Sequence, residues 1–371
     1  MIEIISDNIV SPLGFSTEQN YTAAKAGLSA LKPCGDYFAA YIDNKMLNEA
    51  FADNLNLSPD TFSKVEKAAM LSVKLAVDKC GVDFSSPRTA LYLSTTKGNV
   101  EYMDNGDYQN PDLPLWRTAK KMLDYFGGKG NYVVVSNACI SGLSAIISAA
   151  RALESHRIDC AVVSGVDMLS RFIVQGFSSL KALSASHCRP FDIERNGLNL
   201  GEAAATVVMR RATEGSRFTK FVTGSVHNDA YHISSPSKTA DGSFLALSDV
   251  VKSVDPDSLA FINAHGTSTL YNDEMEAVAV NRAGLNAVPV NSLKAVFGHT
   301  LGAAGIVESI VSMCALNDNT VLKTLNFSQH GVSKKINIVA GVNLTTSKPY
   351  FVKLISGFGG CNAAALFKKG E

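Results

Sequence analysis

The stretch Tyr132-Val133-Val134-Val135-Ser136-Asn137-Ala138-Cys139-Ile140-Ser141-Gly142 joins a short β-rich run to a segment with helical periodicity and places a cysteine at the turn between them. A residue at such a turn lies at a helix N-terminus, where unpaired backbone N–H groups and the helix dipole favour an anion. The sequence therefore predicts a lowered pKa for the Cys139 thiol. A buried, unreactive cysteine at a helix start is the alternative.

Short apolar runs alternate with longer helical stretches on both sides of this turn. Residues 89–94, 160–164 and 205–209 are typical of buried strands, and residues 64–79 have helical periodicity. Strands that alternate with helices favour a buried, largely parallel sheet. We therefore predict an α/β fold.

The second half of the chain repeats the order of these elements. The order matches more closely than the residues do, which indicates an ancient duplication. We predict two halves, 1–215 and 216–371, that share one core and meet near the polar segment 211–219. The repeated strands are residues 259–263, 289–292, 351–357 and 363–367, and the repeated helix is residues 301–316.

Composition narrows the function classes. Of 371 residues, 46% are hydrophobic and 18% are charged, which suits a well-buried globular protein. The 34 basic and 34 acidic residues balance, so no basic excess drives nucleic-acid binding. The N-terminus lacks a signal-peptide pattern, and no apolar run reaches the ~18 residues of a membrane span. The seven cysteines show no zinc-type spacing, so we expect a cytoplasmic, reduced protein without a structural metal.

Two histidines lie in segments of small residues. His265, in Asn263-Ala264-His265-Gly266-Thr267-Ser268-Thr269, follows a predicted strand, and His299 precedes the helix that begins Leu301-Gly302-Ala303-Ala304-Gly305. Either histidine could be structural, and the glycines and alanines after His299 indicate close helix packing. A thiol with separate imidazoles that a fold could bring together nevertheless indicates covalent acyl chemistry.

Together these segments resemble the elongating β-ketoacyl-(acyl carrier protein) synthases, condensing enzymes of the thiolase superfamily. The resemblance implies a thiolase-like, five-layer α-β-α-β-α fold of two pseudo-symmetric halves and a dimer. The presence of two histidines resembles the elongating branch of the family, because the initiating branch has an asparagine in place of the second histidine. Besides the cysteine and histidine segments, the resemblance rests on Val10-Ser11-Pro12-Leu13-Gly14, Arg189-Pro190-Phe191-Asp192, Arg195-Asn196-Gly197, Gly201-Glu202, Asp229-Ala230-Tyr231-His232, Pro236, Lys294 and Gly357-Phe358-Gly359-Gly360 with Asn362.

The resemblance implies a two-stage condensation. Cys139 would take an acyl chain from a carrier-protein thioester, and a malonyl thioester would then lose CO2 and attack it. His265 and His299 would act as neutral N–H donors to the malonyl enolate. The backbone N–H groups of Cys139 and Phe358 would form the oxyanion hole, and Phe358 would gate the site on a glycine-flanked loop.

The resemblance also implies supporting residues. Lys294 would organise the site with Glu276 as its acidic partner, although a structural ion pair is the alternative. Thr267 and Thr269 would bind the phosphopantetheine arm of the carrier protein, and no tightly bound cofactor or metal is implied. Docking of the carrier protein would need a basic surface near the mouth of the site. Lysines that could form one could equally belong to an ordinary solvated helix face. The candidate docking residues are Lys64, Lys67, Lys120 and Lys121.

The chain departs from the family pattern in several places. It is shorter than usual within 97–131 and 184–189, and residues 97–118 resemble a surface excursion or lid. These departures leave the acyl chain length open. The pathway could be fatty-acid synthesis or a specialised polyene- or polyketide-type synthesis, and the dimer could contain two copies of this chain or one copy with a homologous subunit. Substituted positions are Ser356 for an aromatic residue, Cys361 for threonine, Asn196 for aspartate and Ala203 for glycine.

Two other functions stay open. A non-condensing chain-length factor would be a partner subunit, but such subunits typically lack the nucleophile that Cys139 provides. A thiolase or an acyl hydrolase would also use cysteine and histidine. Lys294, the second histidine and the loop around Phe358 argue against this class.

Overall fold

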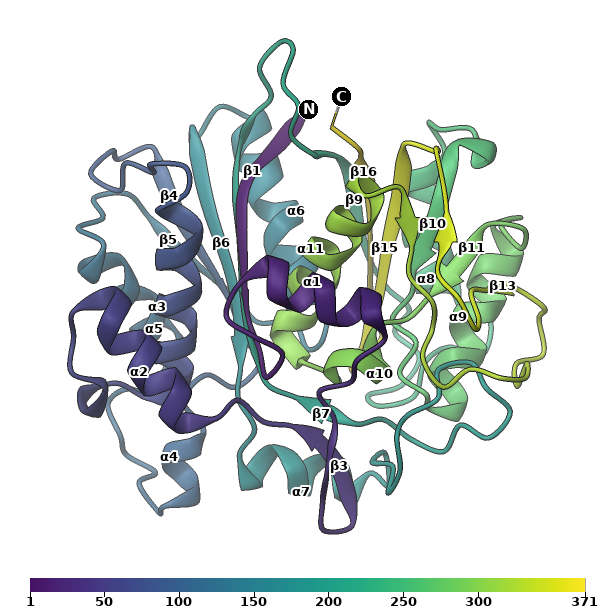
Figure 1. The fold of residues 1–371 in the computed structure, drawn as a ribbon, viewed down its shortest axis with the longest axis horizontal. Coiled ribbons are helices and arrows are strands. Elements are labelled where there is room, and N and C mark those ends of the chain that lie inside the picture. The colour runs from purple at the N-terminus through teal and green to yellow at the C-terminus, as the bar shows by residue number, and fades with distance from the viewer. Residues whose placement is uncertain (371) are drawn as a thin grey trace.

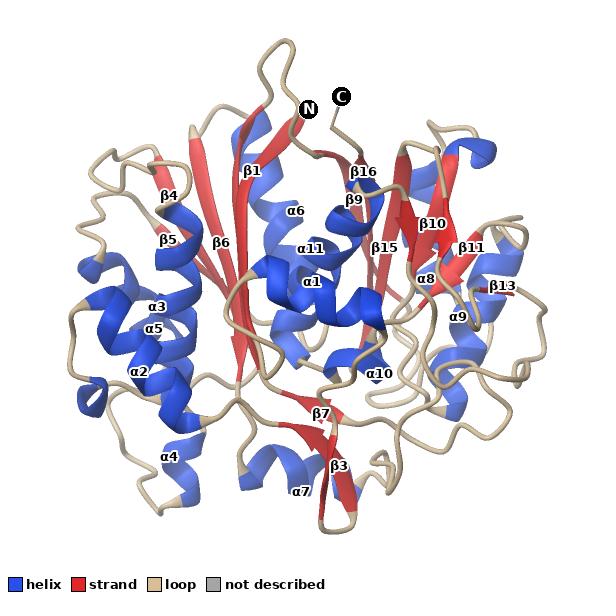
Figure 2. Cartoon of the chain, viewed as in Figure 1, coloured by secondary structure: helices blue, strands red, loops and turns tan. Residues whose placement is uncertain are grey.

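The computed structural model describes residues 1–370, and its centre is an eleven-stranded mixed sheet in the order β13-β11-β10-β15-β16-β9-β1-β8-β6-β4-β5 (Figures 1 and 2). The first-half strands are β1 (Ile2–Val10), β4 (Thr89–Ser94), β5 (Tyr132–Val135), β6 (Cys160–Asp167) and β8 (Ala203–Arg211). The second-half strands are β9 (Lys220–Asn228), β10 (Leu259–Asn263), β11 (Pro289–Asn291), β13 (Asn337–Ile338), β15 (Tyr350–Gly357) and β16 (Cys361–Lys368).

The two halves have the same strand order and the same strand directions. In the first half, β1 and β8 are antiparallel, β8 and β6 are antiparallel, and β4 lies parallel to both β6 and β5. In the second half, β9, β16, β15, β10 and β11 repeat this pattern. The predicted duplicated architecture is confirmed, while the domain boundary at 215/216 stays a prediction. The expectation of a largely parallel sheet is wrong, because the strands nearest the middle run antiparallel.

The halves meet along one narrow seam of the sheet. Only Ile2 and Glu3 of β1 pair with β9, through Phe221 and Lys220. The first-half and second-half strands therefore form two β layers that open away from this seam and leave room for helices between them (Figure 1).

Helices complete the five predicted layers. The central pair, α6 (Ser141–Glu154) and α11 (Ala304–Asn317), contacts strands of both halves. Outside the first half lie α3 (Lys64–Val77), α2 (Asn44–Leu55) and α5 (Leu115–Tyr125), and outside the second lie α8 (Asp241–Val251) and α9 (Leu270–Arg282). The remaining helices are α1 (Thr17–Ala26), α4 (Glu101–Asp104), α7 (Arg171–Ser179) and α10 (Lys294–Phe297).

The smaller elements lie at the periphery of the main sheet. A three-stranded sheet contains β2 (Lys32–Cys34), β3 (Tyr37–Ala40) and β7 (Leu200–Gly201), and β12 (Thr320–Val321) pairs with β14 (Leu344–Thr345). Short 3-10 turns are η1 (Pro59–Thr61), η2 (Pro256–Ser258) and η3 (Leu301–Ala303). The predicted excursion at residues 97–118 is only partly irregular, because it includes α4 and the first turn of α5.

Small residues bring the two central helices into backbone contact. A Cβ at Gly305 of α11 would lie 2.5 Å from the backbone nitrogen of Leu143, and one at Gly142 would lie 2.8 Å from the carbonyl oxygen of Gly302. Both distances are below any real Cβ contact, so the predicted close packing after His299 is confirmed. The turns that precede α6 and α11 are consequently drawn together.

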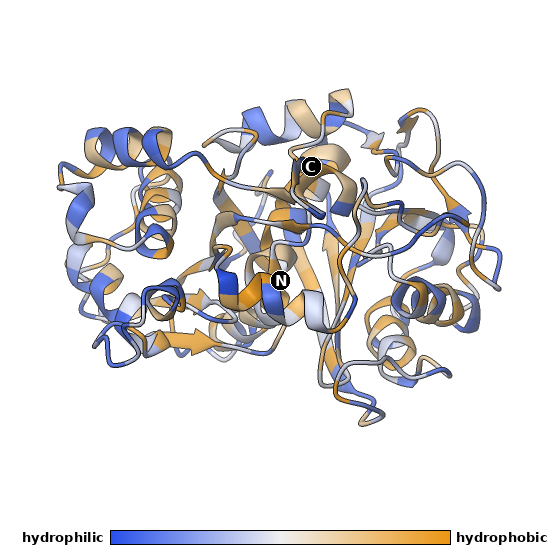
Figure 3. Ribbon diagram, turned by 90° about the horizontal axis from the view of Figure 1, so that it is seen from below, coloured by the Kyte–Doolittle hydropathy of each residue, from blue (hydrophilic) through white to orange (hydrophobic). Residues whose placement is uncertain are grey.

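Apolar residues follow these layers. One buried cluster fills the space around α6 and α11, and two others lie between the outer helices and the sheet on each side. Figure 3 shows the strands largely hydrophobic and the outer helices mixed. Within residues 1–370, no helix combines the length and the apolarity that a membrane crossing requires.

Candidate active site

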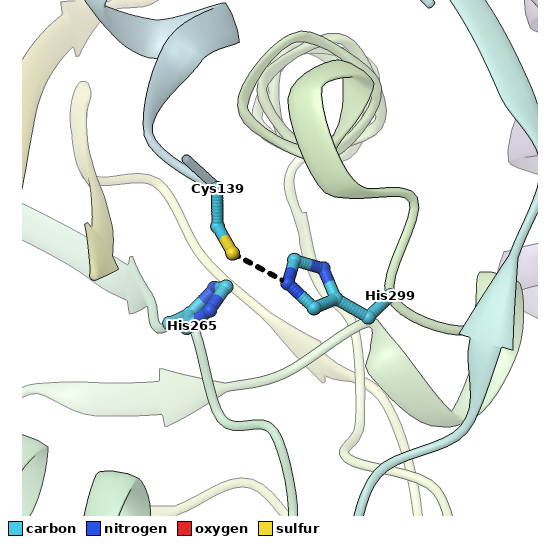
Figure 4. A group of neighbouring side chains, drawn as sticks. All are labelled: Cys139, His265 and His299. Atoms are coloured by element: carbon cyan, nitrogen blue, oxygen red, sulfur yellow. Dashed lines mark hydrogen bonds between the residues drawn. The ribbon is translucent and has the colours of Figure 1, made fainter. Parts of the chain in front are cut away.

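Cys139, His265 and His299 converge between the two halves (Figure 4). Cys139 lies between β5 and α6, His265 lies two residues after the end of β10, and His299 lies between α10 and α11. The Cys139 sulfur and one nitrogen from each imidazole all lie within 4.8 Å of one another. The His299 Nε2 atom is 2.9 Å from the Cys139 Sγ atom, and the two imidazole rings are 4.9 Å apart at 83°. All three side chains are buried.

The turn that carries Cys139 is held by its own backbone. Ala138 has a positive φ of 45°, which is unfavourable for an alanine and turns the chain sharply after β5. The Ser141 hydroxyl donates to the Ala138 carbonyl at 2.6 Å and accepts from the Asn137 N–H at 2.7 Å. These bonds fix the thiol just before α6.

Burial raises the pKa of the Cys139 thiol to about 12, whereas Lys294, Lys97 and the backbone N–H of Phe358 act in the opposite direction. The prediction of a lowered pKa is therefore wrong. A helix terminus contributes at most about 2 kcal/mol, or roughly 1.5 pKa units, whereas full burial shifts a pKa by as much as about 3–5 units. The resting site holds a protonated thiol beside an imidazole.

Both histidines are neutral at ordinary pH. Burial lowers the pKa of His265 and of His299 well below 6.5, and the ammonium of Lys294 lowers both further. Each neutral ring has one N–H donor and one bare nitrogen. Within residues 1–370, the Nδ1 atom of neither ring has a hydrogen-bond partner.

The peptide bonds around the histidines are firmly held. The Glu276 carboxylate accepts hydrogen bonds from the backbone N–H groups of His265 and Gly266, both at 2.6 Å. Burial raises the pKa of this carboxyl group. The backbone N–H of His299 donates to the Asn199 carbonyl at 2.7 Å. Glu276 therefore positions the loop that carries His265.

The predicted pairing of Lys294 with Glu276 is wrong. Lys294 of α10 forms its ion pair with Glu308 of α11, whereas both carboxylate oxygens of Glu276 on α9 accept hydrogen bonds from backbone N–H groups. Glu308 also lies 2.6 Å from the Nζ atom of Lys353 in β15. Glu308 and Lys353 are not among the predicted site residues, although each interrupts an apolar run, in Ile306-Val307-Glu308-Ser309-Ile310 and Phe351-Val352-Lys353-Leu354-Ile355.

A cavity of about 290 Å³ leads to the three reactive side chains. The Thr267 and Thr269 hydroxyls, 2.9 Å apart, lie along it. Phe358 also lines it and stacks on Phe177 at 5.7 Å, with left-handed glycines after it. Other lining residues include Leu180, Lys181, Asn196, His232, Pro236, Leu270, Tyr271 and Ser356.

The four candidate docking lysines do not line this cavity. Lys64 pairs with buried Glu202 at 2.6 Å, and Lys67 donates to Asn48. The other two also have carboxylate partners: Lys120 pairs with Asp124 at 2.7 Å, and Lys121 pairs with Glu66 and Asp112. Their docking role stays a prediction without support from the site, whereas exposed Lys181 does line the cavity.

The substituted positions are accommodated locally. The Ser356 hydroxyl donates to Asn362 at 2.7 Å, and Asn196 accepts from Ser184 at 2.7 Å. The Cys361 thiol donates to the carbonyl of Phe358 at 3.2 Å. Ser356 and Asn196 line the cavity, so they touch the space available to a substrate.

The donor atoms at the centre suit two kinds of chemistry. A thiolate and two imidazoles could hold a zinc ion with an open position. A thiol, a neighbouring imidazole and an access channel also suit acyl transfer to sulfur. Both uses involve the same three side chains.

Comparison with known proteins distinguishes these possibilities. Residues 118–215 match the model of the β-ketoacyl synthase N-terminal domain, and residues 221–328 match that of the C-terminal domain. A 3-oxoacyl-[acyl-carrier-protein] synthase 2 from Staphylococcus aureus is 30% identical, over 98% of this chain and 96% of that protein. The chain belongs to the β-ketoacyl synthase family. The predicted family and enzyme class, a condensing acyltransferase, are confirmed.

Another relative is similar over nearly the whole chain, and two solved structures share its fold. A 3-oxoacyl-[acyl-carrier-protein] synthase 2 from Coxiella burnetii is 27% identical over 97% of this chain and 96% of its own length. The ishigamide ketosynthase/chain length factor has a TM-score of 0.88 at 21% identity. A ketosynthase in complex with its chain length factor from Xenorhabdus doucetiae has a TM-score of 0.86 at 23% identity. Each structural match covers 100% of this chain, and 99% and 98% of the matched chains.

Proposed function

We propose that this β-ketoacyl synthase extends an acyl chain held on Cys139 by decarboxylative condensation with a malonyl thioester. The observation that carries the proposal is the meeting of one protonated thiol and two neutral imidazoles at the end of a single cavity. This arrangement provides a nucleophile, a proton acceptor and N–H donors within reach of one thioester carbonyl.

In the acylation step, the Cys139 sulfur attacks the carbonyl carbon of the incoming thioester. Because burial keeps the thiol protonated, its proton must leave as the carbon–sulfur bond forms, and His299 Nε2, 2.9 Å away, accepts it. The carbonyl oxygen becomes an oxyanion that the backbone N–H groups of Cys139 and Phe358 bind. The carrier thiolate leaves when the carbon–sulfur bond breaks, and it takes the proton from the His299 imidazolium.

In the condensation step, a malonyl thioester replaces the released carrier. Its carboxylate leaves as CO2, and the electron pair of the broken bond forms an enolate. His265 and His299, both neutral, donate N–H hydrogen bonds to the enolate oxygen, and for this step His299 carries its proton on Nε2, the tautomer opposite to the one that accepts the thiol proton. The enolate carbon attacks the acyl carbonyl, the bond to Cys139 breaks, and the thiolate regains a proton from solvent.

We propose an acyl carrier protein as the donor partner, with its phosphopantetheine arm in the cavity beside Thr267 and Thr269. One structural relative is a type II polyketide ketosynthase in complex with its acyl carrier protein, and others are ketosynthases with chain length factors. The second subunit would be a copy of this chain or a homologous partner. A cytoplasmic location stays a prediction, and both fatty-acid synthesis and polyene- or polyketide-type synthesis are compatible with the proposal.

Intact-mass spectrometry tests this function in two stages. Incubation with an acyl carrier-protein thioester should add one acyl group to the chain, and peptide mapping should place it on Cys139. Addition of malonyl carrier protein should then remove the group and produce a β-ketoacyl carrier thioester. Absence of the adduct, as expected for a chain-length factor, or an adduct that only hydrolyses would contradict the proposal.

A further inference from the structure

Lys353 lies at the centre of the second-half sheet and is entirely buried. It belongs to β15, where it pairs with Asn263, the last residue of β10. A lysine is almost never fully buried unless its charge is paired. The contacts of its ammonium therefore indicate what it does.

Five oxygen atoms surround the Lys353 Nζ atom. The side-chain oxygen of Asn263 lies at 2.7 Å, its carbonyl at 3.3 Å, the Ala264 carbonyl at 3.2 Å, and the Leu354 carbonyl at 3.0 Å. The Glu308 carboxylate completes the cage at 2.6 Å. An ammonium has three N–H donors, so the four oxygens of Asn263, Ala264 and Leu354 share them, while Glu308 pairs with the charge. The cage connects β10, β15 and α11 through one charge.

Two of these contacts directly precede His265. Lys353 holds the carbonyls of Asn263 and Ala264, and Glu276 holds the N–H groups of His265 and Gly266. The Nδ1 atom of the His265 ring has no hydrogen-bond partner within residues 1–370. The direction of this ring therefore depends on the held backbone.

The surrounding charges also favour this arrangement. Lys353 and Lys294 both pair with Glu308, and Glu276 lies close enough to act on Lys353. Burial lowers the pKa of Lys353, and the carboxylates of Glu308 and Glu276 oppose that shift. Two lysines and two glutamates thus form one buried cluster beside the imidazoles.

We propose that Lys353 is a positioning residue for the condensation step, and that its ammonium sets the His265 ring by fixing the two carbonyls before it. This inference rests on the proposed function. Acylation of Cys139 uses His299 and does not need the His265 ring. Loss of the Lys353 cage should therefore slow condensation while leaving acylation largely unchanged.

The main test uses Lys353→Met, which keeps similar length and leaves Lys294 paired with Glu308. Removal of one partner from a buried ion pair can cost about 3–5 kcal/mol of stability, so the folding of this variant is checked first, although Lys294 still pairs with Glu308. We expect acylation within about twofold of the wild type and a condensation kcat lower by about 10²-fold, the cost of a displacement near 1 Å. Lys334→Ala, an exposed lysine, is the control.

Chemical rescue separates charge from packing. Lys353→Ala removes three carbons and the ammonium, which n-propylammonium can replace atom for atom. We expect n-propylammonium to restore condensation, and 1-propanol, which has the same size without the charge, to restore little. Equal rescue by 1-propanol, or wild-type condensation in both Lys353 variants, would overturn the positioning role.

Asn263→Ser tests the same cage from its other side if the lysine variants fold poorly. It removes the 2.7 Å contact while keeping every buried charge. We expect a smaller, condensation-selective loss, and an unchanged kcat would overturn the inference. Failure of the wild type to condense at all would contradict the proposed function, which distinguishes the two failures.

Discussion

Gly165 in β6 and Lys353 in β15 occupy equivalent places in the two halves. Gly165 pairs with Ser94, the last residue of β4, as Lys353 pairs with the last residue of β10. A Cβ at Gly165 would lie 2.6 Å from Ser94 Oγ and 3.2 Å from the Cα atom of Ala303. In the second half, the side chain of Lys353 and its ammonium occupy the corresponding position. The duplicated scaffold therefore keeps its topology while each half acquires different chemistry.

The turns before the central helices differ in the same way. The first-half turn is short and carries one thiol between β5 and α6, whereas the second-half turn contains α10 and carries Lys294 and His299 before α11. His265 and the buried cluster of Lys294, Lys353, Glu308 and Glu276 also belong to the second half. The first half thus contributes the nucleophile, and the second contributes proton handling and charge.

The largest expected effect comes from removal of the first half's single reactive group. Cys139→Ala should abolish the acyl adduct and lower product formation by roughly 10⁴-fold or more, because Cys139 is the one cysteine within residues 1–370 that is grouped with both imidazoles. Cys188→Ala is a matched control, since burial raises its pKa to about 12 as well. Intact-mass and product assays check this, and equal losses in both variants would remove Cys139 from its assigned role.

The two histidines should separate under substitution. His265→Ala should leave acylation close to normal and lower condensation by about 10²–10³-fold, the typical cost of one lost oxyanion donor. His299→Ala should lower the condensation rate by the same factor as His265→Ala. It should also slow acylation, because His299 lies 2.9 Å from the thiol. A role for His299 as an enolate donor alone, as the family resemblance implies, would leave acylation intact in this variant. Single-turnover rates for each step decide, and identical profiles would contradict separate roles.

A substitution at Gly165 tests whether the first half tolerates any side chain at the position of Lys353. Gly165→Ala forces a Cβ against Ser94, Ile306 and Ala303, and should destabilise the protein by about 1–3 kcal/mol. Gly176→Ala on α7, where nothing lies within 4 Å, should stabilise by up to about 1 kcal/mol. Denaturant midpoints measure both. A neutral Gly165→Ala would show that α11 packs less tightly there than the distances indicate.

Local sequence was sufficient for the strands that matter most. The predicted bounds 89–94 and 132–135 coincide with β4 and β5, because uninterrupted apolar runs between turn residues leave little choice. Most of α5 escaped prediction, since prolines, Asn and Asp precede it and mask its start. Strand direction in the middle of the sheet also escaped, because it depends on pairing between distant residues.

The site shows the same division. The three reactive residues were found from their motifs, and the structure brings them together. The pKa of Cys139 and the partner of Lys294 were predicted wrongly, since burial and long-range pairing are not visible in local sequence. Lys353 and Glu308 each stand out as a charge in an apolar run, but only the fold shows that they meet.

The smallest expected effect concerns acid stability, and it should originate in the second half. Burial lowers the pKa of His265 and His299 in the folded state, so below pH 6.5 the unfolded chain binds more protons than the native one. Stability therefore falls as pH falls, by about 1 kcal/mol per histidine between pH 6.5 and 5.5. Burial raises the pKa of Asp273 to about 6, so protonation of this group stabilises the folded state as pH falls. The test therefore compares how steeply the free energy of unfolding changes with pH in the variant and in the wild type. In urea titrations, His265→Asn should reduce the loss of unfolding free energy between pH 6.5 and 5.5 by about 1 kcal/mol. His156, an exposed histidine of the first half, is the control, and an equal change in His156→Asn would exclude burial as the cause.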